Sequence, residues 1–195
     1  MNPFKLHTPA TAPVGALPIL EAANKGLGFI PNLYAHLAEA PNALEAYKQL
    51  GALLEKSSLS PTEQQVVLIT VSIENNCAYC VAAHSFLARN MVKVPDNIIA
   101  ALRSGQALPD VKLNALATFA KSVVRERGWV AGSRELNEFF AAGYTPQNAL
   151  EVVLGVTMKT LSNYANHLTD TPLDAAFANE AWELPDDYAC CREAA

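Results

Sequence analysis

The sequence lacks any run of basic residues. Its 195 residues carry 14 Lys and Arg against 19 Asp and Glu, which gives a formal net charge of −5, and the basic residues are scattered along the chain. Nucleic acids and anionic membrane surfaces attract clustered lysine and arginine. We therefore expect neither a nucleic acid nor a membrane among the partners of this protein.

Long hydrophobic runs are also missing. The longest apolar stretch, Val66 to Val71, is far too short to cross a bilayer, because a spanning helix needs about 20 apolar residues. Residues 1–16 hold no apolar core of the kind that a secretory signal peptide contains. We therefore expect a cytoplasmic protein.

Convincing strand patterns are scarce, whereas helical patterns divided by prolines are frequent. Apolar residues at intervals of three and four predict helices over residues 41–56, 112–124, 136–142 and 146–167. A capping residue followed by proline predicts helix starts at Ser60-Pro61, Thr145-Pro146 and Thr171-Pro172.

One β-branched segment, Val66 to Ile73, could instead be a buried strand. A capping box at Ser60 opens it, no turn signal interrupts it before Asn75, and no other strand is available to pair with its backbone. We therefore predict a helix here and an all-α fold. The length fits a single domain over residues 1–195, with a mobile N-terminus to about residue 12 and a mobile tail from about residue 185.

The four cysteines occur in two pairs. Cys190 and Cys191 are adjacent in a polar C-terminal stretch, and we interpret them as incidental thiols. Cys77 and Cys80 form a C-x-x-C, which in a reducing compartment is more often catalytic or metal-binding than structural. His84 follows one turn later, so positions 77, 80 and 84 form one stripe of a helix that begins near Cys77.

This stripe predicts thiol chemistry. The partial positive charge of the helix N-terminus would acidify Cys77, and the two cysteines are close enough to form a disulfide. His84 can take up the proton of Cys80 or hold it beside the thiolate. A cysteine of low pKa with a resolving partner is the arrangement of a thiol peroxidase, which passes through a sulfenic acid and a disulfide and is reset by an external dithiol.

Three alternatives remain open. Cys77, Cys80 and His84 could bind zinc with Glu74 as fourth ligand, in a zinc-stabilised interaction module, although no second C-x-x-C or C-x-x-H is present. The cysteines could also be buried and inert. A thioredoxin-like fold places a C-x-x-C at a helix start, but it needs strands downstream, where the pattern indicates helices. We predict a site without metal or cofactor.

Three segments, Leu59 to Val67, Glu74 to Ser85 and Leu161 to Asp174, resemble the AhpD-like (alkylhydroperoxidase D) branch of the carboxymuconolactone decarboxylase superfamily, in its "peroxidase-related" form. The resemblance implies a helical bundle with the C-x-x-C at the N-terminus of a core helix, assembled as a dimer, trimer or hexamer. It also implies an antioxidant enzyme that reduces hydroperoxides with an external dithiol, or a general dithiol–disulfide oxidoreductase, without metal or flavin. The superfamily's lactone decarboxylases lack the cysteine pair, which argues for redox chemistry here.

By the same resemblance, Cys80 is the peroxidatic cysteine, Cys77 the resolving cysteine, and His84 the family histidine. Two positions depart from the family pattern. Tyr79 stands where the archetype has a histidine, and Gln65 stands where it has a glutamate. An amide cannot relay a proton as a carboxylate does, so the relay of the archetype is incomplete in this chain.

Other residues could complete the proton relay. Glu63 and Glu74 are carboxylates near the motif, although Glu63 also fits a helix capping box and Glu74 a solvated surface. Tyr79 could donate a hydrogen bond in the pocket. The pattern from Ser60-Pro61 to His84 recurs weakly from Thr145-Pro146 to His167, which suggests two related helical hairpins. If these hairpins pack together, His167 approaches the site of the first one. The alternative is a buried histidine without a catalytic role.

Overall fold

The computed structural model describes residues 3–185, and within this range the chain forms helices and no strand. The prediction of an all-α fold is confirmed. The α-helices are α1 (Leu17–Leu27), α2 (Asn32–Leu37), α3 (Pro41–Glu55), α4 (Pro61–Glu74), α5 (Ala78–Leu87), α6 (Asp96–Arg103), α7 (Val111–Arg125), α8 (Arg134–Ala141) and α9 (Pro146–Thr169). Shorter helical turns are η1 (Val14–Ala16), η2 (Ala88–Val92) and η3 (Ala175–Glu180).

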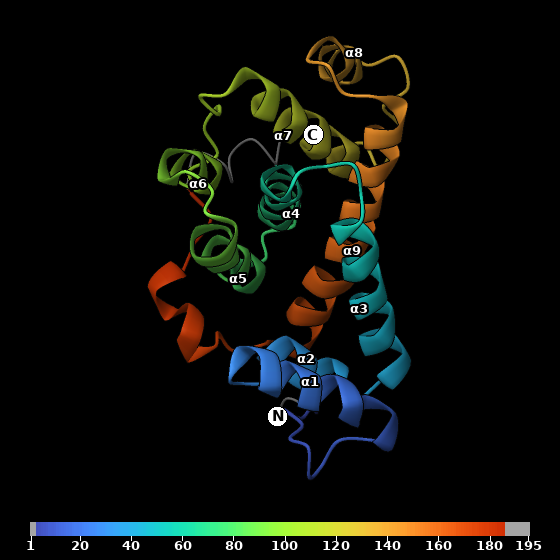
Figure 1. Ribbon diagram of the computed structural model, residues 1–195, viewed down its shortest axis with the longest axis vertical. Coiled ribbons are helices and arrows are strands. Elements are labelled where there is room, and N and C mark those ends of the chain that lie inside the picture. Colours follow the sequence, from blue (N-terminus) through green and yellow to red (C-terminus); the bar gives the residue numbers. More distant parts are fainter. Residues whose placement is uncertain (1–2, 186–195) are drawn as a thin grey trace.

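Helix α4 runs through the centre of the bundle, where α3, α5, α6, α7 and α9 pack around it (Figure 1). Every residue from Val66 to Glu74 is buried. A helix enclosed on all sides needs no polar face, which explains why most residues of this segment are apolar or β-branched on every side of the helix. Ser60 and Glu63 form the predicted capping box with proline in the first turn, so the helical interpretation of this segment is confirmed.

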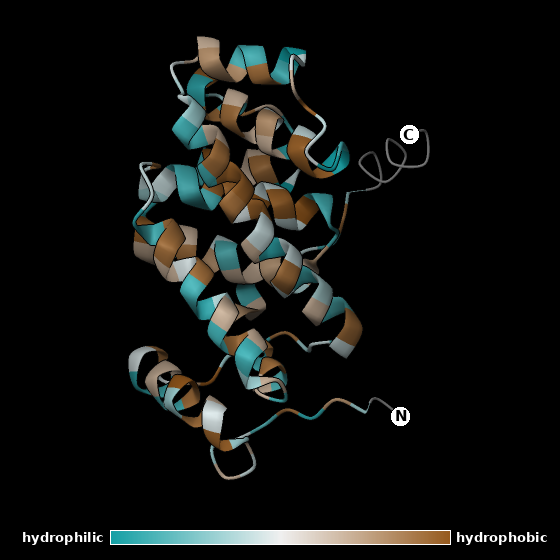
Figure 2. Cartoon of the chain, turned by 90° about the vertical axis from the view of Figure 1, so that its right-hand side faces the viewer, coloured by the Kyte–Doolittle hydropathy of each residue, from teal (hydrophilic) through white to brown (hydrophobic). Residues whose placement is uncertain are grey.

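The interior consists of two hydrophobic clusters, and hydrophobic residues are concentrated where the helices face one another (Figure 2). One cluster joins α4 to α6, α7 and α8. The other joins α1, α2 and α3 to α5 and the middle of α9, and it contains both Cys77 and Cys80. The cysteine motif therefore lies in the apolar core beside the N-terminal helices.

The predicted helix starts at Pro61 and Pro146 are confirmed, but the one at Thr171-Pro172 is wrong. After α9 the chain has no helix until η3 begins at Ala175. The Thr171 hydroxyl lies 3.0 Å from His36 Nδ1 and 2.7 Å from the Thr169 hydroxyl. Because that oxygen bonds to other side chains, it does not cap a helix of its own.

Near the N-terminus, His7 is buried, although it lies in the stretch expected to be mobile. Its backbone N–H donates to the carbonyl of Ala35 at 3.1 Å, and its Nε2 lies 2.6 Å from the carboxylate of Glu39. Cys190 and Cys191 lie outside the described residues, and the extent of the domain stays a prediction. Within residues 3–185, no helix is both long and apolar enough to cross a membrane.

Candidate active site

The cysteine motif lies at the tight turn between α4 and α5. Asn76 has a φ of 53°, a left-handed conformation that asparagine tolerates better than most residues. The backbone N–H of Cys77 donates to the carbonyl of Ser72 at 2.8 Å, which closes the turn. Helix α5 then begins at Ala78, so Cys77 is its N-cap and Cys80 lies in its first turn. The motif thus sits at a helix N-terminus, with Cys80 rather than Cys77 inside the helix.

Both sulfur atoms are buried against α9. Cys77 and Cys80 are each 1% exposed. Asn166 Nδ2 donates a hydrogen bond of 3.1 Å to Cys80 Sγ and a longer one of 3.7 Å to Cys77 Sγ. A hydrogen bond of 3.8 Å joins Cys80 Sγ and Ser162 Oγ. The polar surroundings of the two thiols are therefore supplied largely by a helix that is distant in sequence.

Lys159 belongs to the same face of α9, because positions 159, 162 and 166 are spaced by three and four residues. Its side chain is fully buried, at 0% exposure, and its Nζ has no nitrogen or oxygen atom as hydrogen-bond partner among the described residues. Burying a charge is costly unless an opposite charge accompanies it. None of Lys159, Ser162 and Asn166 was predicted from the sequence. The available signal was their spacing, which places three polar residues on one face of the predicted helix.

The surroundings of the two thiols shift their pKa values in opposite directions. Burial acts to raise the pKa of Cys80, but a hydrogen bond from Cys77 and the charge of Lys159 outweigh it and hold that pKa well below its usual value. The hydrogen bond to Cys80, together with burial, raises the pKa of Cys77. The expectation that the helix start acidifies Cys77 is therefore wrong. Neighbouring thiols cannot both ionise easily, and the negative charge settles on the residue inside the helix.

His84, one turn after Cys80, is buried and neutral. Burial, and then the charge of Lys159, lower the pKa of His84 well below its usual value. Its Nδ1 lies 3.0 Å from Gln65 Oε1. In a neutral imidazole that contact is an N–H donor facing a carbonyl oxygen, which leaves Nε2 as a proton acceptor. Gln65 therefore orients a neutral base and supplies no proton.

Tyr79, between the two cysteines, takes part in a separate hydrogen-bond network. Its hydroxyl donates to Asp174 Oδ2 at 2.5 Å and accepts a hydrogen bond of 3.3 Å from the backbone N–H of Leu33. Burial and the hydrogen bond to Asp174 raise the pKa of Tyr79. Tyr79 thus joins α5 to α2 and to the segment that follows α9.

Two of the predicted relay residues make their contacts elsewhere. Glu63 accepts a hydrogen bond of 2.8 Å from the backbone N–H of Ser60, and it lies 3.4 Å from Lys112 Nζ. It therefore serves the capping box, which was its alternative interpretation. His167 is exposed on α9 and stacks on Tyr164. The structure does not bring His167 to the cysteines, nor does it bury this histidine.

Glu74, the third relay candidate, is buried rather than solvated. Its carboxylate lies 2.7 Å from Arg125 Nε and 3.8 Å from Lys121 Nζ, so it holds α4 to α7. Across residues 3–185, no group of three or more His, Cys, Asp and Glu side chains is arranged to hold a metal ion. The structure therefore does not support zinc bound by the motif and Glu74.

A hydrophobic cavity of about 440 Å³ adjoins the site. Its lining contains His84 and a set of aromatic side chains, and none of its lining residues is charged. Tyr47, which also lines it, has a pKa raised by burial and then by nearby Tyr34 and the two cysteines. Tyr47 thus lines the cavity and also interacts electrostatically with both cysteines.

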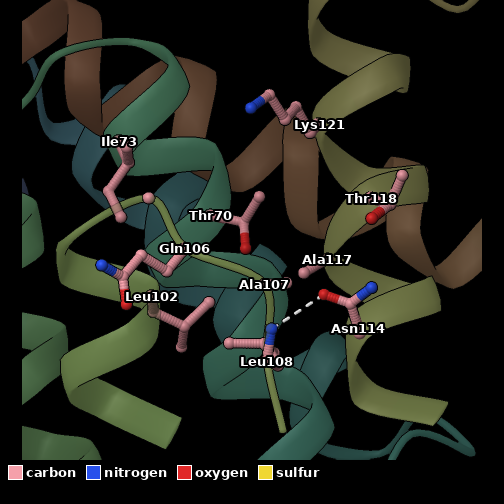
Figure 3. A pocket seen from close by; sticks show the side chains of 11 residues that line it. Thr70, Ile73, Leu102, Gln106, Ala107, Leu108, Asn114, Ala117, Thr118 and Lys121 are labelled. Atoms are coloured by element: carbon pink, nitrogen blue, oxygen red, sulfur yellow. Dashed lines mark hydrogen bonds between the residues drawn. The ribbon is translucent and has the colours of Figure 1, made fainter. Parts of the chain in front are cut away.

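A second cavity, of about 250 Å³, lies between α4, α7 and the segment that connects α6 to α7 (Figure 3). Thr70, Asn114 and Lys121 contribute polar groups to it, and Asn114 Oδ1 accepts a hydrogen bond of 2.8 Å from the Leu108 backbone. It contains no cysteine or histidine, whereas His84 lines the first cavity.

Residues 38–122 match the model of the carboxymuconolactone decarboxylase family. The fold resembles the crystal structure of an alkylhydroperoxidase AhpD core, an uncharacterized peroxidase-related protein from Ralstonia eutropha JMP134. The TM-score is 0.79 at 21% identity, over 89% of this chain and 93% of the other. A peroxidase-related protein from Silicibacter sp. TM1040 gives a TM-score of 0.75 at 20% identity, over 90% and 92% of the two chains.

The debrominase Bmp8 is also similar, with a TM-score of 0.69 at 17% identity over 86% of this chain and 90% of Bmp8. A cysteine-to-alanine variant of Bmp8 in complex with 2,3,4-tribromopyrrole gives a TM-score of 0.70. At such low identities these likenesses establish the fold. No curated protein is significantly similar to the chain in sequence.

Proposed function

Because this chain is an AhpD-like member of the carboxymuconolactone decarboxylase superfamily, we propose that it is a thiol-dependent peroxidase that works through a Cys77–Cys80 disulfide. One observation carries the proposal. Two buried thiols share a hydrogen-bond donor in Asn166, and their surroundings lower the pKa of Cys80 and raise that of Cys77. A nucleophilic thiolate beside a protonated resolving thiol is what a two-cysteine peroxidase requires.

The reaction has two steps. The Cys80 thiolate attacks the terminal oxygen of a hydroperoxide ROOH, the O–O bond breaks, and the departing alkoxide takes a proton from solvent to give the alcohol. Cys77 then attacks the sulfur of the resulting sulfenic acid, which forms the disulfide and releases water. The proton of Cys77 passes to the departing hydroxide to give that water, and the neutral His84, one turn after Cys80, is the base that we propose for the proton transfers of the site. An external dithiol restores both thiols by exchange.

The cavity supports an organic substrate. Its lining is aromatic and aliphatic, without a charged side chain, so it favours a neutral, apolar hydroperoxide over a charged one. A homo-oligomeric assembly, a cytoplasmic location and an external dithiol as the reductant stay predictions.

The test is peptide-mapping mass spectrometry of the reduced protein after brief exposure to one equivalent of cumene hydroperoxide. We expect a Cys77–Cys80 disulfide in the wild type, a trapped sulfenic acid at Cys80 in Cys77→Ser, and no reaction in Cys80→Ser. Replacing Cys190 and Cys191 by serine serves as the control and leaves the reaction intact. Full peroxide consumption by Cys80→Ser would refute the proposal. Rapid disulfide formation with oxidised glutathione, but none with peroxide, would favour a general dithiol–disulfide oxidoreductase.

Reductive dehalogenation is a second candidate, and the uncharged aromatic cavity beside His84 favours it. The similarity in fold to the debrominase Bmp8 also supports it. The same dithiol would supply two electrons: an aryl bromide, the Cys80 thiolate and the Cys77 thiol give the arene, the disulfide and bromide. Incubation of the reduced protein with 2,3,4-tribromopyrrole tests it by bromide release. Absence of bromide, with peroxide turnover intact, eliminates this candidate.

A further inference from the structure

Lys159 differs from the other buried charged side chains of residues 3–185. Those others are carboxylates with partners: Glu74 with Arg125, Glu180 with Arg89, and Asp174 with Tyr79. Lys159 is more deeply buried than any of them, at 0% exposure, and its Nζ has no nitrogen or oxygen atom as hydrogen-bond partner in this part of the chain. An ammonium in such a place needs a counter-charge.

Lys159 shares one face of α9 with Ser162 and Asn166, which hydrogen-bond with Cys80 Sγ. The ionisable groups on which its charge acts are Cys77, Cys80 and His84. No carboxylate is among them. His84 is neutral and Cys77 keeps its proton, so the thiolate of Cys80 is the anion that balances the ammonium.

The counter-charge exists only while the cysteines are reduced. We propose that Lys159 is a positioning residue that stabilises the dithiol form of the Cys77–Cys80 pair and destabilises its disulfide, which makes the pair a strongly oxidising couple. The inference rests on the proposed function, because it takes this pair as the redox centre. It adds a property that peroxide turnover does not require, namely an equilibrium bias toward the reduced state.

The balanced exchange shows where the charge goes. The Cys77–Cys80 disulfide and an external dithiol give the Cys80 thiolate, the Cys77 thiol, the external disulfide and one proton. In the reverse direction Lys159 loses its partner anion and is left as an unpaired buried cation. This loss costs free energy, and the cost falls on the oxidised state. Stabilisation of the reduced thiolate is a known route to an oxidising dithiol couple.

The first test uses a protein in which Cys190 and Cys191 are replaced by serine and Lys159, Cys77 and Cys80 are unchanged. A disulfide that closes a short loop ordinarily stabilises a protein or leaves its stability unchanged. We expect the opposite here: the reduced protein should unfold in urea at a higher midpoint than the oxidised protein. A higher midpoint for the oxidised protein would overturn the inference.

The second test measures the equilibrium constant of the cysteine pair against reduced and oxidised glutathione. Lys159→Met keeps the length of the side chain and removes its charge, and we expect it to favour the disulfide at least tenfold, or about 30 mV. Lys159→Arg should restore most of the bias, and Lys121→Met, which removes a lysine outside the cysteine site, should leave the constant unchanged. An unchanged constant in folded Lys159→Met refutes the inference. If the wild-type pair forms no disulfide at all, the proposed function itself fails.

Discussion

Asn166 on α9 donates a hydrogen bond of 3.1 Å to the sulfur of Cys80, which precedes it by 86 residues in sequence. The carboxamide also reaches Cys77, at 3.7 Å, so one donor serves both members of the pair. An N–H donor that is already in place stabilises the negative charge of a thiolate, because the surrounding dipoles do not have to reorient when the charge forms. Helix α9 is therefore as much a part of the site as the C-x-x-C motif itself.

Asn166→Leu should raise the pKa of Cys80 and slow its oxidation. A hydrogen bond to a charged group contributes about 1.5–3 kcal/mol, so we expect a loss of about tenfold or more in the rate of disulfide formation at pH 7. Stopped-flow measurement with cumene hydroperoxide gives the rate, and thiolate absorbance against pH gives the pKa. His167→Leu, one residue further along α9 and exposed, is the matched control. A wild-type rate in folded Asn166→Leu would show that the hydrogen bond has no catalytic role.

The general architecture could be predicted from the sequence because local signals coincide with it. Proline and capping residues fix the starts of α4 and α9, and the absence of a partner strand settles the nature of α4. The position of the C-x-x-C at a helix N-terminus follows from the turn that precedes it. Each of these features is determined by residues close to it in sequence, so it can be predicted from the sequence alone.

The charge distribution of the site could not be predicted in the same way. It depends on Lys159 and Asn166, which the fold brings to Cys80 from a helix about 80 residues further along. A lysine in a helical pattern ordinarily indicates an exposed position. For the same reason, the sequence around Glu74 does not predict that this residue is buried and paired with Arg125. Long-range pairings of this kind decided which cysteine ionises.

Gln65→Glu should raise the pKa of His84. The wild-type amide accepts the Nδ1–H of a neutral ring at 3.0 Å, whereas a carboxylate there would stabilise the imidazolium. In the wild type, burial lowers the pKa of the folded His84 ring. In the unfolded chain the same histidine gains its proton below about pH 6.5. The folded protein therefore loses stability as the pH falls below that value. The substitution should reduce that loss. NMR titration of the ring and urea unfolding at pH 5 and 7 measure both effects.

Gln65→Met provides the uncharged control for this experiment. It removes the acceptor without adding a charge, so the pKa of His84 should stay low while the ring loses its fixed orientation. The same upward shift in both variants would mean that solvent entry, rather than the carboxylate, changes the titration of His84.

Arg125→Met should destabilise the fold without changing the cysteine chemistry. Arg125 is the nearer partner of the buried Glu74 carboxylate, at 2.7 Å, and Lys121 is more distant at 3.8 Å. Removing one partner of a buried pair leaves a charge poorly compensated, and we expect a loss of about 2–4 kcal/mol in the free energy of unfolding. Urea unfolding measures it. Glu74→Gln should keep the wild-type rate of disulfide formation, and a large drop in that rate would restore Glu74 as a proton relay.

Tyr79→Phe should cost more stability at neutral pH than in acid. Burial raises the pKa of Asp174. In the folded protein this carboxyl therefore keeps its proton above about pH 4, where the carboxyl of the unfolded chain loses it. The stability of the fold then falls as the pH rises through the folded pKa. The Tyr79 hydroxyl donates to Asp174 Oδ2 at 2.5 Å, and a hydrogen bond to an ionised acceptor is the stronger one.

Removing the Tyr79 hydroxyl therefore matters most once Asp174 is ionised, and it also leaves the Leu33 N–H without its 3.3 Å partner. We expect a loss of about 1–3 kcal/mol in the free energy of unfolding at pH 7 and a smaller loss at pH 4. Urea unfolding of Tyr79→Phe, Asp174→Asn and the double variant measures the coupling between the two residues. Because Asp174→Asn cannot ionise, the effect of Tyr79→Phe in that background should not vary with pH. A pH-dependence that persists there would place its origin outside the Tyr79–Asp174 contact.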